Sequence, residues 1–194
     1  MNAETVRSFI AIELPESVKN DLTGLENSLK AKTPAVVKWM SPDGIHLTLK
    51  FLGDVAVDGI DEVKMGIDEA VQGVSPFQLE LQGVGAFPNL NRVQVIWVGV
   101  KGELDKLMYF QKQVEANMEQ LGFPREERDF TPHLTLGRVR NYVSPDDRRK
   151  IGQVLGNTTF SSSGPINVEA VHLVKSQLTP VGAAYTSLYT ALFK

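Results

Sequence analysis

One four-residue sequence occurs twice in this chain, and it constrains the fold and the function more than any other feature. The residues His-Leu-Thr-Leu at 46–49 recur at 133–136, so that less than half of the chain separates the two copies. On a β-strand, side chains alternate between two faces, which places the His and Thr of each copy on one face and the two leucines on the other, toward a core. If both halves of the chain fold alike and face each other, two imidazoles and two hydroxyls line the cleft between them.

These four polar side chains suit the hydrolysis of a strained cyclic phosphodiester. One imidazole would take a proton from water while the other gives a proton to the departing ribose oxygen, and an ordinary histidine pKa of about 6.5 allows both roles. The hydroxyls of Thr48 and Thr135 would donate to the phosphoryl oxygens, where negative charge develops. A single His-x-Thr on a strand is more often structural, but its repetition predicts a site. The pattern therefore predicts His46 and His133 as a proton-transfer pair that needs no metal or cofactor, and it leaves open which of them is the acid.

Composition limits the classes of protein to which this chain can belong. The chain has 194 residues, of which 42% are apolar, and it has no cysteine, which is typical of one globular domain without disulfides or Cys-based metal sites. No run of roughly 18 apolar residues exists and the N-terminus lacks the features of a signal peptide, so a cytoplasmic protein without membrane spans is expected. A net charge of −3 favours a small or terminal substrate over long nucleic acid held by many phosphate contacts.

Strand-like and helix-like patterns alternate along the chain. Apolar alternation and β-branched residues predict strands at 6–13, 36–40, 45–52, 77–84, 93–100, 133–139, 166–175 and 185–193. Apolar residues at three- and four-residue spacing predict a helix that begins near Pro15 and further helices at 60–71, 103–121 and 144–155. Short connections between strand pairs predict antiparallel hairpins. The chain is therefore predicted to have an α+β fold with largely antiparallel sheets, as a single two-lobed domain over residues 1–194.

The surroundings of both motifs carry a resemblance to a known family. The segments concerned are RSFIAI at 7–12, VKW at 37–39, HLTLKFLG at 46–53, GAFP at 85–88, WVGV at 97–100 and FTPHLTLGR at 130–138. Over nearly its whole length the chain resembles the two-histidine phosphoesterase superfamily, and within it the RNA 2′,3′-cyclic phosphodiesterases, also called 2′-5′ RNA ligases. The resemblance implies two pseudo-symmetric lobes with outer helices, a catalytic cleft between them, and hydrolysis of RNA 2′,3′-cyclic phosphate ends to 2′-phosphomonoesters. It also implies that His46 is the proton donor and His133 the proton acceptor.

Three other polar residues near the motifs are weaker candidates. Lys50 lies four residues after His46, which predicts the same strand face and allows contact with a second phosphate, although a solvated lysine is an equal alternative. Arg138 closes the second motif as the family pattern does and suits phosphate recognition, but its parity turns it away from His133 unless a bulge near Gly137 re-aims it. His172 lies in an apolar strand without a neighbouring threonine and is interpreted as structural.

Several functions remain open from the sequence alone. The leading hypothesis is the cyclic phosphodiesterase, with RNA ligation as the reverse reaction, acting as a monomer on RNA ends or small nucleotides without an obligate protein partner. A second is a related enzyme for 2′-5′ oligoadenylates or ADP-ribose 1″,2″-cyclic phosphate, and a third is a non-catalytic module that binds nucleotides or RNA ends. A metal-dependent phosphoesterase is disfavoured because no Asp, Glu and His residues cluster around either motif.

Overall fold

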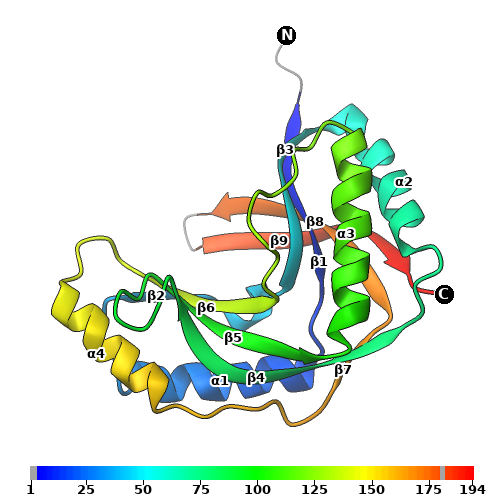
Figure 1. The fold of residues 1–194 in the computed structure, drawn as a ribbon. Helices are drawn as coiled ribbons and strands as arrows, with labels where there is room; N and C mark the ends of the chain where they lie inside the picture. The colour runs from blue at the N-terminus through cyan, green and yellow to red at the C-terminus, as the bar shows by residue number, and fades with distance from the viewer. Residues whose placement is uncertain (1–3, 180–181) are drawn as a thin grey trace.

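The computed structural model describes residues 4–179 and 182–194, which form two antiparallel sheets flanked by helices (Figure 1). The first sheet has the strand order β3 (Leu47–Ala56), β1 (Thr5–Ile12), β8 (Ala170–Thr179) and β9 (Gly182–Leu192). The second sheet has the order β2 (Val37–Trp39), β6 (His133–Val139), β5 (Val95–Gly102), β4 (Phe77–Phe87) and β7 (Ile166–Val168). The predicted α+β class with antiparallel sheets is confirmed, and the two motifs belong to different sheets.

The helices divide between the two sheets. Their bounds are α1 (Glu16–Lys30), α2 (Ile60–Val71), α3 (Leu104–Gln120) and α4 (Pro145–Gly156). The pair α2 and α3 packs beside the first sheet, whereas α1 and α4 lie along the second (Figure 1). Two helix ends have capping features: the Ser144 side chain accepts a hydrogen bond from the Asp147 backbone N–H at 3.1 Å, and Gly122, with a φ of 88°, follows the end of α3.

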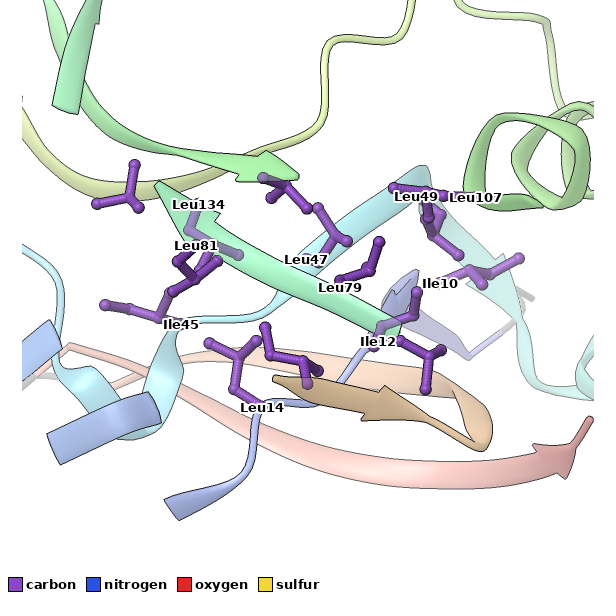
Figure 2. Packing of buried hydrophobic residues seen from close by; sticks show 14 of the residues in the cluster. Ile10, Ile12, Leu14, Ile45, Leu47, Leu49, Leu79, Leu81, Leu107 and Leu134 are labelled. Atoms are coloured by element: carbon purple, nitrogen blue, oxygen red, sulfur yellow. The ribbon is translucent and has the colours of Figure 1, made fainter. Parts of the chain in front are cut away.

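A single cluster of buried apolar side chains extends through both sheets and contains the leucines of both motifs, at 47, 49, 134 and 136. Figure 2 shows Leu47 of β3, Leu79 of β4 and Leu134 of β6 within this cluster. The predicted alternation therefore holds over each four-residue motif, since the leucines enter the core and leave the His and Thr on the other face. We call that other face of each sheet the motif face.

The first motif strand has a β-bulge directly after its threonine. In the pairing of β3 with β1, Thr48 lies opposite Ala11, whereas Lys50 lies opposite Ile10, so that Leu49 is the extra residue. Because Ile10 is a core residue, Lys50 shares the core face of the sheet.

The second motif strand has the same irregularity at the same place. In the pairing of β6 with β5, Thr135 lies opposite Trp97 and Gly137 opposite Ile96, which leaves Leu136 as the extra residue. In both strands the bulge reverses the parity of the residues that follow. The fifth residue after each motif histidine, and not the fourth, therefore returns to the motif face.

The other predicted elements lie close to where the patterns placed them, with one exception. The predicted strand at 166–175 is two strands, β7 and β8, because the chain passes here from one sheet to the other. β7 pairs with β4 in the second sheet, and β8 pairs with β1 in the first. Among the described residues, no helix is long and apolar enough to cross a membrane.

Candidate active site

His46 lies between the short 3₁₀ helix η1 (Pro42–Gly44) and β3, and its ring is held by two aromatic side chains. The rings of Phe9 and Tyr185 each meet it edge-to-face, with centroid separations of 5.2 Å and 4.7 Å. The imidazole also donates a hydrogen bond to the Gly44 backbone, two residues earlier in the chain. These contacts fix the ring plane, so that His46 has a defined orientation on the motif face.

His133 is the first residue of β6 and is held in a corresponding way. Its Nδ1 lies 2.6 Å from the backbone oxygen of Thr131, again two residues earlier. A carbonyl oxygen only accepts hydrogen bonds, so Nδ1 carries the hydrogen and, in the neutral ring, Nε2 keeps its lone pair. Phe87 meets the His133 ring edge-to-face at 4.9 Å. The two histidines thus share one arrangement, a carbonyl on one side and an aromatic edge on the other.

The structure brings the two motifs together. β3 and β6 contact each other, and Figure 1 shows the beginnings of the two strands side by side. Because His46 immediately precedes β3 and His133 opens β6, both imidazoles lie at this junction. The hydroxyls of Thr48 and Thr135 lie on the same motif faces, and neither has a hydrogen-bond partner within the described residues. Two imidazoles and two free hydroxyl donors are therefore gathered where the sheets meet.

The surroundings of His46 are partly buried and contain opposing charges. Burial lowers the pKa of His46 below its ordinary value of 6.5, and the nearby cation of Lys19 acts in the same direction. The carboxylate of Glu13 opposes this effect. A small pocket of about 120 Å³ adjoins the ring, and its walls include Glu13, Lys19, Asp43 and Ser187. An anion that entered here would raise the pKa of His46 and favour its protonated form.

His172 lies on the motif face of the first sheet, opposite Ala11. Its Nδ1 is 3.0 Å from the Thr190 hydroxyl and 3.8 Å from a carboxylate oxygen of Glu13. Burial lowers the pKa of His172, and Glu13 opposes the shift. The interpretation of His172 as structural stays a prediction, but the residue lies among the groups that surround His46.

Arg138 lies on the same face as His133 and Thr135. In the pairing of β6 with β5 these three residues face positions 95, 97 and 99, which alternate regularly along β5. The bulge at Leu136 therefore turns Arg138 to the face of His133. It lies next to Gly137, where the sequence analysis allowed a bulge. The guanidinium is exposed to solvent on the motif face.

Lys50 is not where the sequence predicted it. The bulge at Leu49 turns it to the core face, where only 5% of the residue is exposed. Its ammonium group forms a 2.6 Å ion pair with Glu115 of α3 and donates to the backbone oxygen of Pro124 at 2.8 Å. The prediction that Lys50 shares the face of His46 is wrong, and the buried ion pair leaves no route to a substrate phosphate.

Phe51 takes the position on the motif face that was expected for Lys50. It lies opposite Phe9, and it is 74% exposed. Phe51 and Arg138 are each the fifth residue after a motif histidine, so an aromatic ring in one sheet corresponds to a guanidinium in the other. An alignment of the two motifs with each other would have revealed this correspondence, whereas strand parity alone concealed it.

No group of three His, Asp or Glu side chains in the described part of the chain is placed to hold a metal ion. Chemistry at this junction can be built from the imidazoles, the hydroxyls and the Arg138 guanidinium.

Known proteins are similar to this chain in both sequence and fold. The family described as LigT like phosphoesterase matches residues 12–97 and 98–185, one motif in each match. RNA 2′,3′-cyclic phosphodiesterases of Methanothermobacter thermautotrophicus and Archaeoglobus fulgidus are 33% and 32% identical to it, over 94% of this chain and 96% and 98% of their own lengths.

Solved structures agree with this result. The crystal structure of TT0787 of Thermus thermophilus has a TM-score of 0.79 at 25% identity, and the two chains are covered to 96% and 97%. Escherichia coli LigT complexed with 3′-AMP also has a TM-score of 0.79, at 21% identity and with 98% and 99% of the chains covered, and it shares the fold. The chain belongs to the LigT like phosphoesterase family.

Proposed function

We propose that this protein hydrolyses 2′,3′-cyclic phosphate ends of RNA to 2′-phosphomonoesters. The observation that carries the proposal is the repeated site: one oriented imidazole lies at the start of each of two adjoining strands, beside one threonine hydroxyl that has no hydrogen-bond partner among the described residues. The relatives named as RNA 2′,3′-cyclic phosphodiesterases support the choice of substrate. All these groups come from one chain, so a monomer supplies the complete site.

His133 acts as the base in this proposal. The hydrogen on Nδ1 is held by the Thr131 carbonyl, so the lone pair on Nε2 is free to take a proton from the attacking water. As the water oxygen bonds to phosphorus, the bond from phosphorus to the 3′ oxygen breaks. His46 gives its proton to that oxygen, which leaves as a hydroxyl, and the phosphate stays on the 2′ oxygen.

The threonines and the substrate charge assist this transfer. The hydroxyls of Thr48 and Thr135 donate to the non-bridging oxygens, where charge accumulates in the transition state. Burial lowers the pKa of the free His46, so the protonated acid forms best when the anionic phosphate is bound beside it. Binding of the substrate phosphate thereby favours the protonated form of His46 that acts as the acid.

The test is hydrolysis of an RNA oligonucleotide that ends in a 2′,3′-cyclic phosphate, in EDTA, with the product's phosphate position assigned by phosphorus NMR. The wild type should yield a 2′-phosphate, whereas His46→Ala and His133→Ala should each lose at least about 10² in kcat because each removes one proton-transfer group. Thr48→Val and Thr135→Val should lose about 10²–10³.

His172→Gln is the matched control, since it alters an imidazole near the site to which this proposal assigns no proton transfer. Near-full activity of either motif variant, or binding without turnover by the wild type, would refute the assignment.

A further inference from the structure

Glu13 lies beside His46 at the end of the first sheet. The last pair in the register of β1 with β3 is Ile12 with Leu47, and both of these residues belong to the core. The next residues along the two strands are Glu13 and His46, and alternation returns both of them to the motif face. Both side chains also line the same small pocket of about 120 Å³, so their polar groups lie within interaction range of each other.

The second sheet has no side chain at the corresponding position. In the pairing of β5 with β6, His133 lies opposite Gly99. A Cβ added to Gly99 would lie 2.7 Å from the backbone oxygen of Gln82 in β4, a distance that real Cβ atoms essentially never show. The two motif histidines therefore differ in their cross-strand neighbour. His46 has a carboxylate there, whereas His133 has a glycine that the adjacent strand keeps free of any side chain.

The carboxylate of Glu13 is not neutralised by a lysine or an arginine, since none in the described chain forms an ion pair with it. Its ion-pair contact there is to Nδ1 of His172, at 3.8 Å. Burial lowers the pKa of His172 below 6.5, so this ring is mostly uncharged at neutral pH. Half of the Glu13 side chain is exposed, so water and salt weaken the effect of its charge on His46 without removing it.

Other titratable groups surround the His46 ring from several elements: Lys19 of α1, Asp43 of η1, His172 of β8 and Tyr185 of β9. Burial and the cation of Lys19 both disfavour a proton on the ring. Tyr185 is uncharged, because burial raises the pKa of its hydroxyl. Asp43 adds a second carboxylate to the pocket wall. Glu13 is the charged side chain that opposes the effects of burial and Lys19.

We propose that Glu13 is a positioning residue whose carboxylate holds the proton on the His46 imidazole until the departing 3′ oxygen takes it. A negative charge beside an imidazole favours its protonated form. The acid needs that form, whereas the base needs a free lone pair, and Gly99 leaves His133 without such a charge. The inference rests on the proposed function, and it goes further by assigning a role to a residue outside both motifs.

Glu13→Gln tests the inference, because it removes the charge and keeps the shape of the side chain. Glu13→Asp keeps the charge. Glu16→Gln is the matched control, since it makes the same change of charge at an exposed residue in the first turn of α1. Two measurements are made on each protein: the pH dependence of kcat for an RNA end with a 2′,3′-cyclic phosphate, and an NMR titration of the His46 ring in the free protein.

In Glu13→Gln the alkaline limb of the kcat profile, which reports loss of the His46 proton, should move down by about half a pH unit. A unit charge at roughly 6 Å in water-like surroundings has an effect of this size. On that limb kcat should fall about threefold, and below it kcat should not change. The NMR titration of His46 should shift in the same direction. Glu13→Asp and Glu16→Gln should both stay close to the wild type.

Two results would overturn the inference while leaving the proposed function intact. In the first, the His46 titration or the alkaline limb does not move in Glu13→Gln. In the second, Glu13→Gln lowers kcat equally at every pH, which is the effect of a purely structural role. If the wild type hydrolyses no RNA end, the proposed function fails and this inference fails with it.

Discussion

The two motif histidines have identical neighbours in sequence and different neighbours in space. His46 is packed between Phe9 and Tyr185, and burial lowers its pKa. His133 has one aromatic neighbour within the described residues, Phe87, and the Thr131 carbonyl fixes its tautomer. A backbone carbonyl two residues earlier holds each ring, so the two copies differ in burial and in aromatic contacts, and the assignment of acid and base is the one that the family resemblance implies.

The repeat was sufficient to predict which residues gather at the site, but not how each is held. The sequence pattern located both histidines and both threonines because alternation along a short strand is a local property. Tyr185 could not be linked to His46 in this way, since it comes from β9 and reaches the ring only through the pairing of whole strands.

Lys50 provides a prediction about stability. Lys50→Ala would leave the carboxylate of Glu115, with a side chain only 12% exposed, without its cation. Breaking a buried pair on one side costs about 3–5 kcal/mol, and replacing both partners with apolar residues costs much less. Urea denaturation should show a loss of about that size for Lys50→Ala and substantial recovery for Lys50→Met combined with Glu115→Leu. A loss below about 1 kcal/mol, the range of a surface ion pair, would contradict this account.

At the level of elements, the two bulges decide which residues reach the site. A bulge depends on the partner strand as well as on the strand that contains it, so β3 and β6 do not reveal it on their own. In β6, Gly137 made a bulge possible, and the sequence analysis gave such a bulge as the condition for Arg138 to lie on the face of His133. The bulge in β3 has no glycine beside it, which is why the face of Lys50 was mispredicted.

Gly137→Ala tests how closely β2 packs against β6. An added Cβ would lie 2.9 Å from Cγ1 of Val37 and 3.2 Å from the backbone oxygen of Lys38. Such overpacking costs about 1–3 kcal/mol, because Val37 or the backbone of β2 has to shift. Thermal unfolding measures this loss of stability.

The matched control is Gly24→Ala in α1, where no atom lies within 4 Å of the added Cβ. That substitution should stabilise the protein by about 0.4–1 kcal/mol, because alanine has less freedom than glycine in the unfolded chain. If Gly137→Ala proved equally stabilising, the packing of β2 would be looser than described.

Over the whole molecule, the partly buried histidines connect stability to pH. His46 and His172 both have a pKa below 6.5 in the folded protein, whereas the unfolded chain has the ordinary value. As the pH falls through 6.5, the unfolded chain binds more protons than the folded one, so the free energy of unfolding decreases. This stability is fully present above pH 6.5 and is lost progressively below it.

Urea denaturation at about pH 7 and about pH 5.5 measures the effect. The variant with both His46→Gln and His172→Gln should lose less stability than the wild type between these values. Equal losses in the two proteins would mean that other groups govern the change.

The position of β1 has a consequence for the order in which the fold can assemble during translation. β1 lies between β3 and β8, so the strand made first is completed by one of the strands made last. While β8 and β9 are still inside the ribosome, β1 has one open edge and Tyr185 cannot orient the His46 ring. Most of the second sheet can already form, since β2, β4, β5 and β6 precede α4. The nascent chain would therefore have an ordered His133 before the His46 ring is fixed. The complete active site would form only when β8 and β9 have paired with the first sheet.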